Sequence, residues 1–397
     1  MYSDEDEDDF EEDDWEAEEP CFKRYKPENS RSSKCVQNVK KKNMPLIIKE
    51  EILRRIENSS SDKDKILDWA ENALKLPFGK HVKLPVNKNS SAKVLAKFFA
   101  KVNKTLDNAV HGMSSVKEEV LNYIAQFIST NSESMPRILG LRGSPGIGKT
   151  AIIRKGFAEA LNRPMVCLSM GGVRDSSFFL GHDYTYIGSK YGCLAQSLIK
   201  LNCMNGIIFL DEIDKVSDTS EGHEIQNLLL HITDPMQNHA FQDKYFAGLD
   251  LDLSKIIFVF SYNHEKMIDP VLRDRIYTIK VPDPTLNEKI VIAQKYLLKD
   301  IEVNVGFKAG DIVITSEVVE SIVRTYCKGQ QGVRGLKKCL ENLLLKVNTA
   351  RYLQDDKKYK CFQKKLEFPF TITQSVADEL LVECKPAEDK YLSSMYI

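Results

Sequence analysis

Short apolar runs alternate with longer amphipathic stretches in the middle of the chain, from residue 136 to about 281. This alternation is typical of a mostly parallel α/β sheet, because each strand of such a sheet is buried on both faces and returns through a helix. The predicted strands are 138–141, 165–169, 207–210, 256–261 and 278–281.

On both sides of this segment the apolar residues follow a helical period instead. From 45 to 77, and again from about 94 to 102, they recur at the three- and four-residue spacing of an amphipathic helix. After Pro284 the same spacing returns, and it predicts a late helix with one apolar face. That face is formed by Val333, Leu336, Leu340, Leu343 and Val347.

Charge separates the beginning of the chain from the rest. The net charge of the 397 residues is -1, but residues 1–20 hold thirteen acidic and no basic side chains. The remainder therefore has 56 basic and 44 acidic side chains, a net charge of +12. A run so dense in one sign has too little apolar surface to fold, so we expect residues 1–43 to be a disordered acidic tail followed by a Lys-rich linker.

Composition also bounds the compartment. No apolar run reaches the roughly 18–20 residues of a membrane span, and the acidic N-terminus is unlike a signal peptide. The nine cysteines are scattered singly, without the paired spacing of metal sites. We expect reduced thiols in the cytoplasm or another reducing intracellular compartment.

The first candidate for chemistry is a glycine-rich loop between a predicted strand and a predicted helix. It reads Gly143, Ser144, Pro145, Gly146, Ile147, Gly148, Lys149 and Thr150. Backbone N–H groups of such a loop and the following helix N-terminus cradle phosphates. Lys149 would reach the outer phosphates of ATP, and the Thr150 hydroxyl would bind Mg²⁺.

A second candidate follows about sixty residues later. An apolar strand ends in Asp211 and Glu212, which places two carboxylates at the edge of the sheet where the nucleotide binds. Asp211 suits coordination of Mg²⁺, and Glu212 suits activation of the attacking water.

Two further features stand at the ends of later elements. Asn263 follows the predicted strand 256–261 and could hold the attacking water against the γ-phosphate. Arg273 and Arg275 lie in a loop from which an arginine could reach the phosphate of a neighbouring subunit.

The stretch between the two phosphate-site motifs resembles the AAA+ ATPase module of the Lon protease family. The residues that carry this resemblance are Gly171 to Asp175, Gly181-His182, Thr185 to Ser189, Gly192, Leu194 and Gln196. Further matches are Asp234-Pro235, Gln237-Asn238, Phe241, Asp243, Tyr245 and Gly332 to Leu336. Upstream similarity makes the resemblance cover about 44–382.

This resemblance implies roles for individual residues. Asn263 would be sensor 1, Arg275 the arginine finger in trans and Arg334 sensor 2. Tyr186 and Ile187 would form a pore loop that grips extended polypeptide. His111 stands in the adenine-side motif, where the order Val110-His111-Gly112 departs from the family pattern.

The implied fold is an α/β AAA+ P-loop module, a parallel sheet with flanking helices, followed by a small helical lid domain. The expected divisions are a helical segment at 44–104, the nucleotide-binding domain at 105–284, the lid at 285–352 and a C-terminal extension at 353–397. The implied assembly is a homo-oligomeric ring, a hexamer, with unfolded or misfolded polypeptide as substrate.

The Ser–Lys peptidase domain and the large N-domain of that family have no match in this sequence. We therefore expect an ATP-driven polypeptide motor without its own peptidase. One alternative is the ATPase part of a Lon-type protease whose peptidase is lost or is a separate chain. Two others are a nucleic-acid-remodelling AAA+ protein and a scaffold that binds ATP without turnover.

Overall fold

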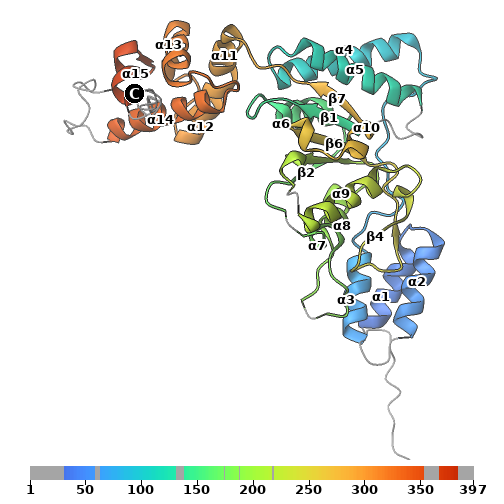
Figure 1. Cartoon of the computed structure of the whole chain (residues 1–397). Helices are drawn as coiled ribbons and strands as arrows, with labels where there is room; N and C mark the ends of the chain where they lie inside the picture. The colour runs from blue at the N-terminus through green and yellow to red at the C-terminus, as the bar shows by residue number, and fades with distance from the viewer. Residues whose placement is uncertain are drawn as a thin grey trace, which may run out of the picture.

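The computed structural model describes residues 31–58, 63–130, 138–173, 175–186, 188–216, 219–352 and 366–382. Figure 1 shows three regions along a bent molecule. A three-helix unit lies at one end, an α/β domain occupies the centre, and a mainly helical lid extends to the side. The acidic run 4–19 lies outside the described residues.

The central sheet has five parallel strands in the order β2-β3-β6-β1-β7. The strands are β1 (Ile138–Arg142), β2 (Met165–Ser169), β3 (Ile207–Asp211), β6 (Ile257–Tyr262) and β7 (Ile276–Lys280). All five strands predicted from the apolar runs are confirmed, with shifts of one or two residues at their ends. Because all strands run the same way, their carboxyl ends share one edge, and both phosphate-site motifs lie there.

Alternate residues of these strands enter two separate cores. Phe209 of β3 and Val259 of β6 face one core, whereas Leu210 and Phe260 face the other. Helices cover the first face, namely α4 (Ala92–Ala109), α5 (Ser114–Ser129), α6 (Lys149–Ala151) and the π-helical η2 (Ile152–Ala158). On the other side lie α7 (Ser177–Leu180), α8 (Cys193–Leu201), α9 (Ser220–Thr233), α10 (Pro270–Arg275), and the pair β4 (Phe241–Gln242) and β5 (Asp250–Leu251). Burial on both faces explains why the strands read as continuous apolar runs.

Short 3₁₀ turns connect some of these elements. They are η3 (Ile213–Lys215), η4 (Asn238–Ala240) and η5 (Glu265–Met267).

The three-helix unit corrects the predicted extent of the disordered linker. It consists of α1 (Arg31–Lys41), α2 (Leu46–Glu57) and α3 (Lys63–Ala73). Cys35 and Val39 of α1 are buried, and Lys42 donates to the carbonyl oxygens of Leu74 and, at 2.7 Å, Leu76. The prediction of a disordered linker is therefore wrong over 31–43, where tertiary contacts order a polar helix.

This unit shares its core with the α/β domain. Trp69 of α3 is fully buried, and its indole N–H donates to the carbonyl oxygen of Tyr245 at 2.9 Å. The predicted boundary at 104 falls inside α4, which packs its apolar face, including Val102 and Leu106, into the same core as Phe157 of η2. Helix α4 therefore belongs to the α/β domain.

The lid has its own hydrophobic core. Its helices are α11 (Leu286–Ile292), the π-helical η6 (Ala293–Leu297), α12 (Leu298–Val305), α13 (Ser316–Tyr326), α14 (Arg334–Tyr352) and α15 (Gln374–Leu380). Strand β8 (Ile312–Ile314) pairs in parallel with β9 (Phe370–Ile372), and Ile372 and Leu380 are fully buried in the lid core. The predicted end of the lid at 352 is thus wrong, because residues 370–380 complete this domain. Within the described part of the chain, no helix combines the length and apolarity that crossing a bilayer requires.

Asp243 is a buried carboxylate that predicts a dependence of stability on pH. Its oxygens accept the backbone N–H groups of Gly192 at 2.8 Å and Tyr245 at 2.9 Å. Burial nevertheless raises the pKa of Asp243 from 3.8 to about 6. A raised pKa means that the folded state binds the proton more tightly than the unfolded state does. The contribution of the protonated Asp243 carboxyl to the free energy of unfolding is therefore complete at low pH and is lost as the pH rises through about 6.

We therefore expect acidification to stabilise the wild type relative to an Asp243→Asn variant. Between about pH 7.5 and pH 5, the difference in their free energies of unfolding should change by about 1 kcal/mol in favour of the wild type. Urea denaturation of both proteins at the two pH values measures this difference. A difference that stays constant with pH would contradict the assignment.

Candidate functional site

The glycine-rich loop joins β1 to the short helix α6. Gly148 has φ 101°, a left-handed conformation that a residue with a Cβ adopts only with strain, and helix α6 begins at the next residue, Lys149. The loop therefore turns sharply at the end of a strand and presents a helix N-terminus, which is the geometry that binds phosphate.

Lys149 is the cation of this loop and is almost fully buried. Its ammonium group donates to the carbonyl oxygen of Gly143 at 2.5 Å and to Oδ1 of Asn263 at 2.6 Å. Burial lowers the pKa of Lys149, while Asp211, Asp214 and Glu212 act in the opposite direction. The lysine is thus held at the base of the site between β1 and β6, beside the acidic residues of β3.

The two carboxylates at the end of β3 occupy different backbone conformations. Asp211 is the last residue of β3, whereas Glu212 has φ 61° and ψ 45°, a left-handed conformation that costs a non-glycine residue free energy. The Glu212 carboxylate lies against Gly171, where a Cβ would stand 2.7 Å from Oε2. Gly171 therefore makes room for the carboxylate that we assign to the attacking water.

Asp214 positions the loop that carries Asn263. It is buried, and its Oδ2 accepts the backbone N–H groups of Asn263 at 3.1 Å and His264 at 3.0 Å. The side chain of Asn263 is thereby fixed beside Lys149. Asp214 was not among the site residues predicted from the sequence; the available signal was its place in the acidic cluster that follows β3.

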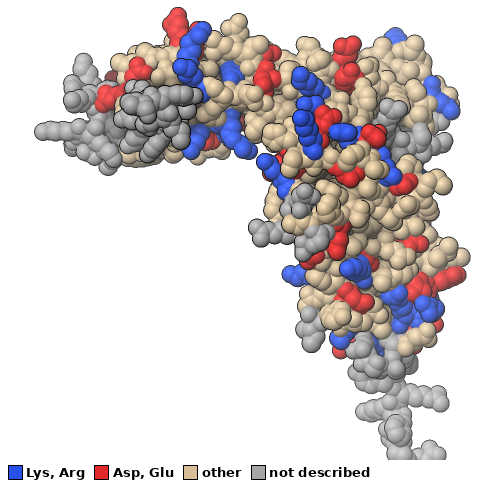
Figure 2. Space-filling view, in the orientation of Figure 1, with Lys and Arg blue, Asp and Glu red and all other residues tan. Residues whose placement is uncertain are grey.

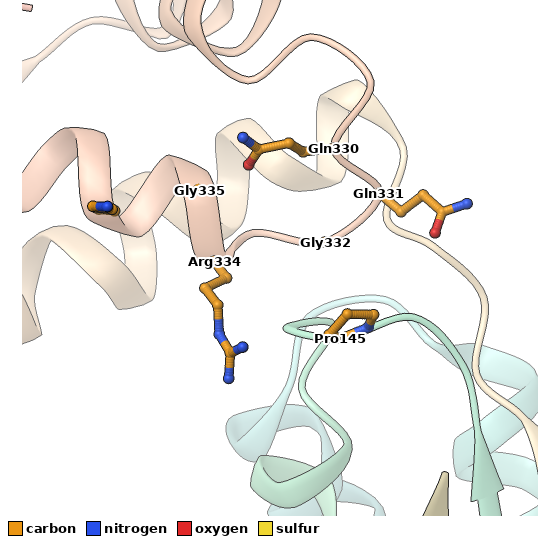
Figure 3. A pocket seen from close by; sticks show the side chains of 7 residues that line it. Pro145, Gln330, Gln331, Gly332, Arg334 and Gly335 are labelled. Atoms are coloured by element: carbon orange, nitrogen blue, oxygen red, sulfur yellow. The ribbon is translucent and has the colours of Figure 1, made fainter. Parts of the chain in front are cut away.

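The lid closes over the loop from the other side. The N–H of Val333 donates to the carbonyl oxygen of Gly146 at 3.0 Å, and Ser144 donates to Oε1 of Gln331 at 2.7 Å. A Cβ at Gly332 would meet the carbonyl oxygen of Pro145 at 2.4 Å, so only glycine allows this approach. Figure 3 shows Arg334 extending from the first turn of α14 alongside the loop that carries Pro145. A hollow of about 390 Å³ beside this contact is lined by lid residues and by Pro145.

A cavity of about 340 Å³ joins these groups. Its lining includes the predicted residues Pro145, Gly146, Gly148, Lys149, Thr150, Asp211, Glu212, Asn263 and Arg334. Lys337, one turn after Arg334 on α14, also lines the cavity and was missed by sequence reasoning. The cavity therefore combines cations from the loop and the lid with carboxylates from the sheet.

This donor set fits a nucleotide with Mg²⁺. The Thr150 hydroxyl and the Asp211 carboxylate line one cavity, and Mg²⁺ is usually bound by one or two protein groups together with phosphate oxygens and water. Among the described residues, no group of three or more His, Cys, Asp or Glu side chains is arranged to hold a metal ion.

Several predicted residues are not brought to this cavity. Arg275 lies at the end of α10, where it donates to the carbonyl oxygen of Leu230 at 2.6 Å and pairs with Asp234 at 3.3 Å. Tyr186 is 70% exposed on the loop between α7 and α8. Ile187 lies outside the described residues.

His111 belongs to the turn between α4 and α5. Its neighbours Val110 and Met113 approach Gly148, where a Cβ would lie 3.8 Å from Val110 and 3.5 Å from Met113. His111 itself does not line the cavity but helps to lower the pKa of Glu288 in the lid, after the hydrogen bonds from Thr285. Val110 and Met113 do not line the cavity either, although they lie closer to the phosphate loop.

Comparison with known proteins agrees with the fold. Residues 139–282 match the model of the ATPase family associated with various cellular activities (AAA). The chain is 39% identical over 268 residues to a Lon protease homolog of Acanthamoeba polyphaga mimivirus, covering 67% of this chain and 26% of that protein. It is 35% identical over 306 residues to the Lon protease of Flavobacterium johnsoniae, covering 77% of this chain and 35% of the relative.

A third relative is the Lon protease of Xanthomonas oryzae pv. oryzae, 40% identical over 244 residues, which covers 61% of this chain and 28% of that protein. The chain spans only 24% to 38% of the length of the curated relatives it matches.

The parallel sheet, the phosphate loop and the acidic pair agree with the family match, and residues 139–282 form an ATPase domain of the AAA class. Within that class, the chain is a relative of the ATPase region of the Lon proteases.

Proposed function

We propose that this chain is a Lon-like AAA+ motor that uses the hydrolysis of ATP to unfold, thread or remodel polypeptides. One observation carries the chemical half of this proposal. Lys149, Asp211, Glu212, Asn263 and Arg334 come from four separate segments and line a single cavity of about 340 Å³.

Each of these residues has a distinct task in the proposed reaction. Lys149 and Arg334 would neutralise the outer phosphates, and Thr150 and Asp211 would hold Mg²⁺. Glu212 accepts the proton of the attacking water, and Asn263 holds that water in line. The Mg²⁺ ion, when bound, draws negative charge from the departing phosphate.

A neighbouring subunit would complete the site. Arg275 is two-thirds buried against α9 and lies away from the cavity of its own chain. In a ring, the same arginine would face the γ-phosphate bound by the adjacent copy, where it would stabilise developing charge. A homo-oligomeric ring, hexameric as in the resembling family, is therefore part of the proposal.

Tyr186 supports polypeptide as the substrate. Its aromatic side chain is 70% exposed, and hydrogen bonds of the preceding residue, Thr185, help to hold the loop. Asp183 accepts the N–H and hydroxyl of Thr185 at 2.9 and 2.8 Å, and Lys65 of α3 donates to the Thr185 carbonyl oxygen at 3.2 Å. An exposed aromatic ring can press on any side chain, which suits sequence-tolerant pulling.

A Tyr186→Ala variant tests this assignment. We expect it to keep the basal rate of ATP hydrolysis but to lose most of the stimulation by an unfolded protein, because the gripping ring is gone. Tyr352→Ala is the matched control, since Tyr352 is 73% exposed on α14 in the lid. Equal stimulation of wild type and Tyr186→Ala would contradict the pore-loop role.

Peptide-bond hydrolysis is the second candidate, because the matched relatives are named Lon proteases. A casein degradation assay with ATP and Mg²⁺ separates the two. A motor alone leaves casein intact, whereas ATP-dependent fragments would favour the second candidate.

Nucleic acid is less suited to the face of the molecule that Figure 2 shows. On the face in Figure 2, lysine and arginine side chains are interspersed with acidic ones over the whole described body. A protein that tracks a phosphate backbone usually gathers its cations into a stripe or patch.

A further inference from the structure

A second set of polar residues lies at the opposite edge of the central sheet. Arg163, Asn205 and Lys255 each stand two residues before a strand, namely β2, β3 and β6. These three strands are neighbours and run parallel, so their amino ends meet at one edge. The three residues are therefore brought together on the side of the sheet away from the phosphate loop.

The segment 81–87 crosses this edge and adds further side chains. The Asn205 carboxamide pairs with the backbone of Val82, accepting its N–H at 2.8 Å and donating to its carbonyl oxygen at 2.9 Å. The N–H of Met204 donates to the Lys80 carbonyl oxygen at 2.8 Å. These bonds fix His81 and Lys83 on either side of Val82.

Together the two segments enclose a cavity of about 340 Å³. Arg163, only 6% exposed, forms its floor, and the exposed Lys83, Lys255 and His81 stand around its opening. Val86 and Ile128 provide apolar walls.

Within the part of the chain that the structure describes, no carboxylate lines this cavity. Among the described residues, none of Lys83, Arg163 and Lys255 forms an ion pair within 4.0 Å. A buried cation without a counterion is costly, and proteins usually pair such a group or use it for binding.

Arg163 also retains an unused donor. One Nη1–H donates to the carbonyl oxygen of Asn205, and the guanidinium lies 5.0 Å from the ring centre of Phe127. Its Nε is buried and has no hydrogen-bond partner. Burial lowers the pKa of Arg163 to about 10, so the group is still charged at neutral pH.

We propose that this cavity binds a phosphate-type oxyanion, with Arg163 at its floor and Lys83 and Lys255 at its opening. An oxyanion would provide the missing negative charge beside the guanidinium group and the two lysines. The volume leaves room for a small organic group beside Val86 and Ile128. This site is independent of the proposed motor function, because it uses the other edge of the sheet.

His81 would report on the bound anion. Partial burial lowers the pKa of His81, as do Lys255 and Arg163, whereas the Gly79 backbone and Asp252 oppose this shift. An anion among these cations favours the imidazolium form, so binding should raise the pKa of His81.

The test is a titration of the full chain with pyrophosphate in a Lys149→Ala background, in which the phosphate loop lacks its cation. We expect pyrophosphate to raise the pKa of His81, followed through its ring signals by NMR and assigned with His81→Gln. Lys83→Gln and Lys255→Gln should each weaken binding by about tenfold, since each removes a charge-assisted hydrogen bond. Lys88→Gln, an exposed lysine outside the cavity, is the control and should bind as the parent does.

Two results would overturn the proposal. The first is a His81 pKa that does not move with pyrophosphate, or affinities that are equal in all four proteins. The second would come from a parallel titration, in which a synthetic peptide of residues 4–19 replaces pyrophosphate. If that peptide moves His81 and pyrophosphate does not, the cavity receives a carboxylate-rich segment instead.

Discussion

Replacing Arg275 with alanine should lower kcat for ATP hydrolysis by about 10³-fold or more, while the Kd for ATP changes little. Binding is preserved because Arg275 does not line the cavity of its own chain. Hydrolysis is lost because the transition state on the neighbouring subunit no longer meets a guanidinium group. Steady-state kinetics and nucleotide titration measure the two quantities.

The control for this variant must address folding, since Arg275 also joins α10 to Leu230 and Asp234 of the α9 region. Arg273→Ala, on the same helix, should hydrolyse ATP at nearly the wild-type rate.

Mixing Arg275→Ala with Lys149→Ala subunits gives the sharper test. Each variant is inactive alone, but mixed rings contain sites with an intact Lys149 on one subunit and an intact Arg275 on its neighbour. Activity that does not recover in mixed rings of normal size would contradict an arginine supplied in trans.

A Glu212→Gln variant should have the second large effect. We expect kcat to fall by about 10² to 10⁴-fold, because a carboxamide cannot accept the proton of the attacking water. ATP binding should persist, since Lys149, Thr150 and Asp211 remain in the cavity.

Asp211→Asn is the matched comparison, because it should weaken Mg²⁺-dependent ATP binding as well as turnover. A Glu212→Gln variant with a wild-type rate would remove the proposed general base.

The strands could be predicted because each is a short apolar run buried on both faces, and few other secondary structures give such a run. The extent of the lid could not be predicted, because β9 is only three residues long and pairs with β8, which begins 58 residues earlier in the chain. Helix α1 was missed for a similar reason. Only Cys35 and Val39 of its eleven residues are buried, and contacts from α2 and α3 decide that this polar segment is ordered.

The candidate site likewise combines residues that the sequence predicts with contacts that it does not. Lys149 and Asp211 were predictable because their motifs stand directly at strand ends, and parallel strands bring those ends together. The contact between Glu212 and Gly171 depends on the left-handed backbone at Glu212, which no sequence pattern indicates. The bonds from Asp214 to the Asn263 loop depend on the placement of β3 beside β6.

The most direct test of the proposed motor function is the steady-state rate of ATP hydrolysis by the wild type with a permanently unfolded protein and, separately, with double-stranded DNA. We predict that the unfolded protein raises the rate severalfold and that DNA leaves it unchanged. A rate raised by DNA and unaffected by unfolded protein would contradict the proposal that ATP hydrolysis here drives work on polypeptides.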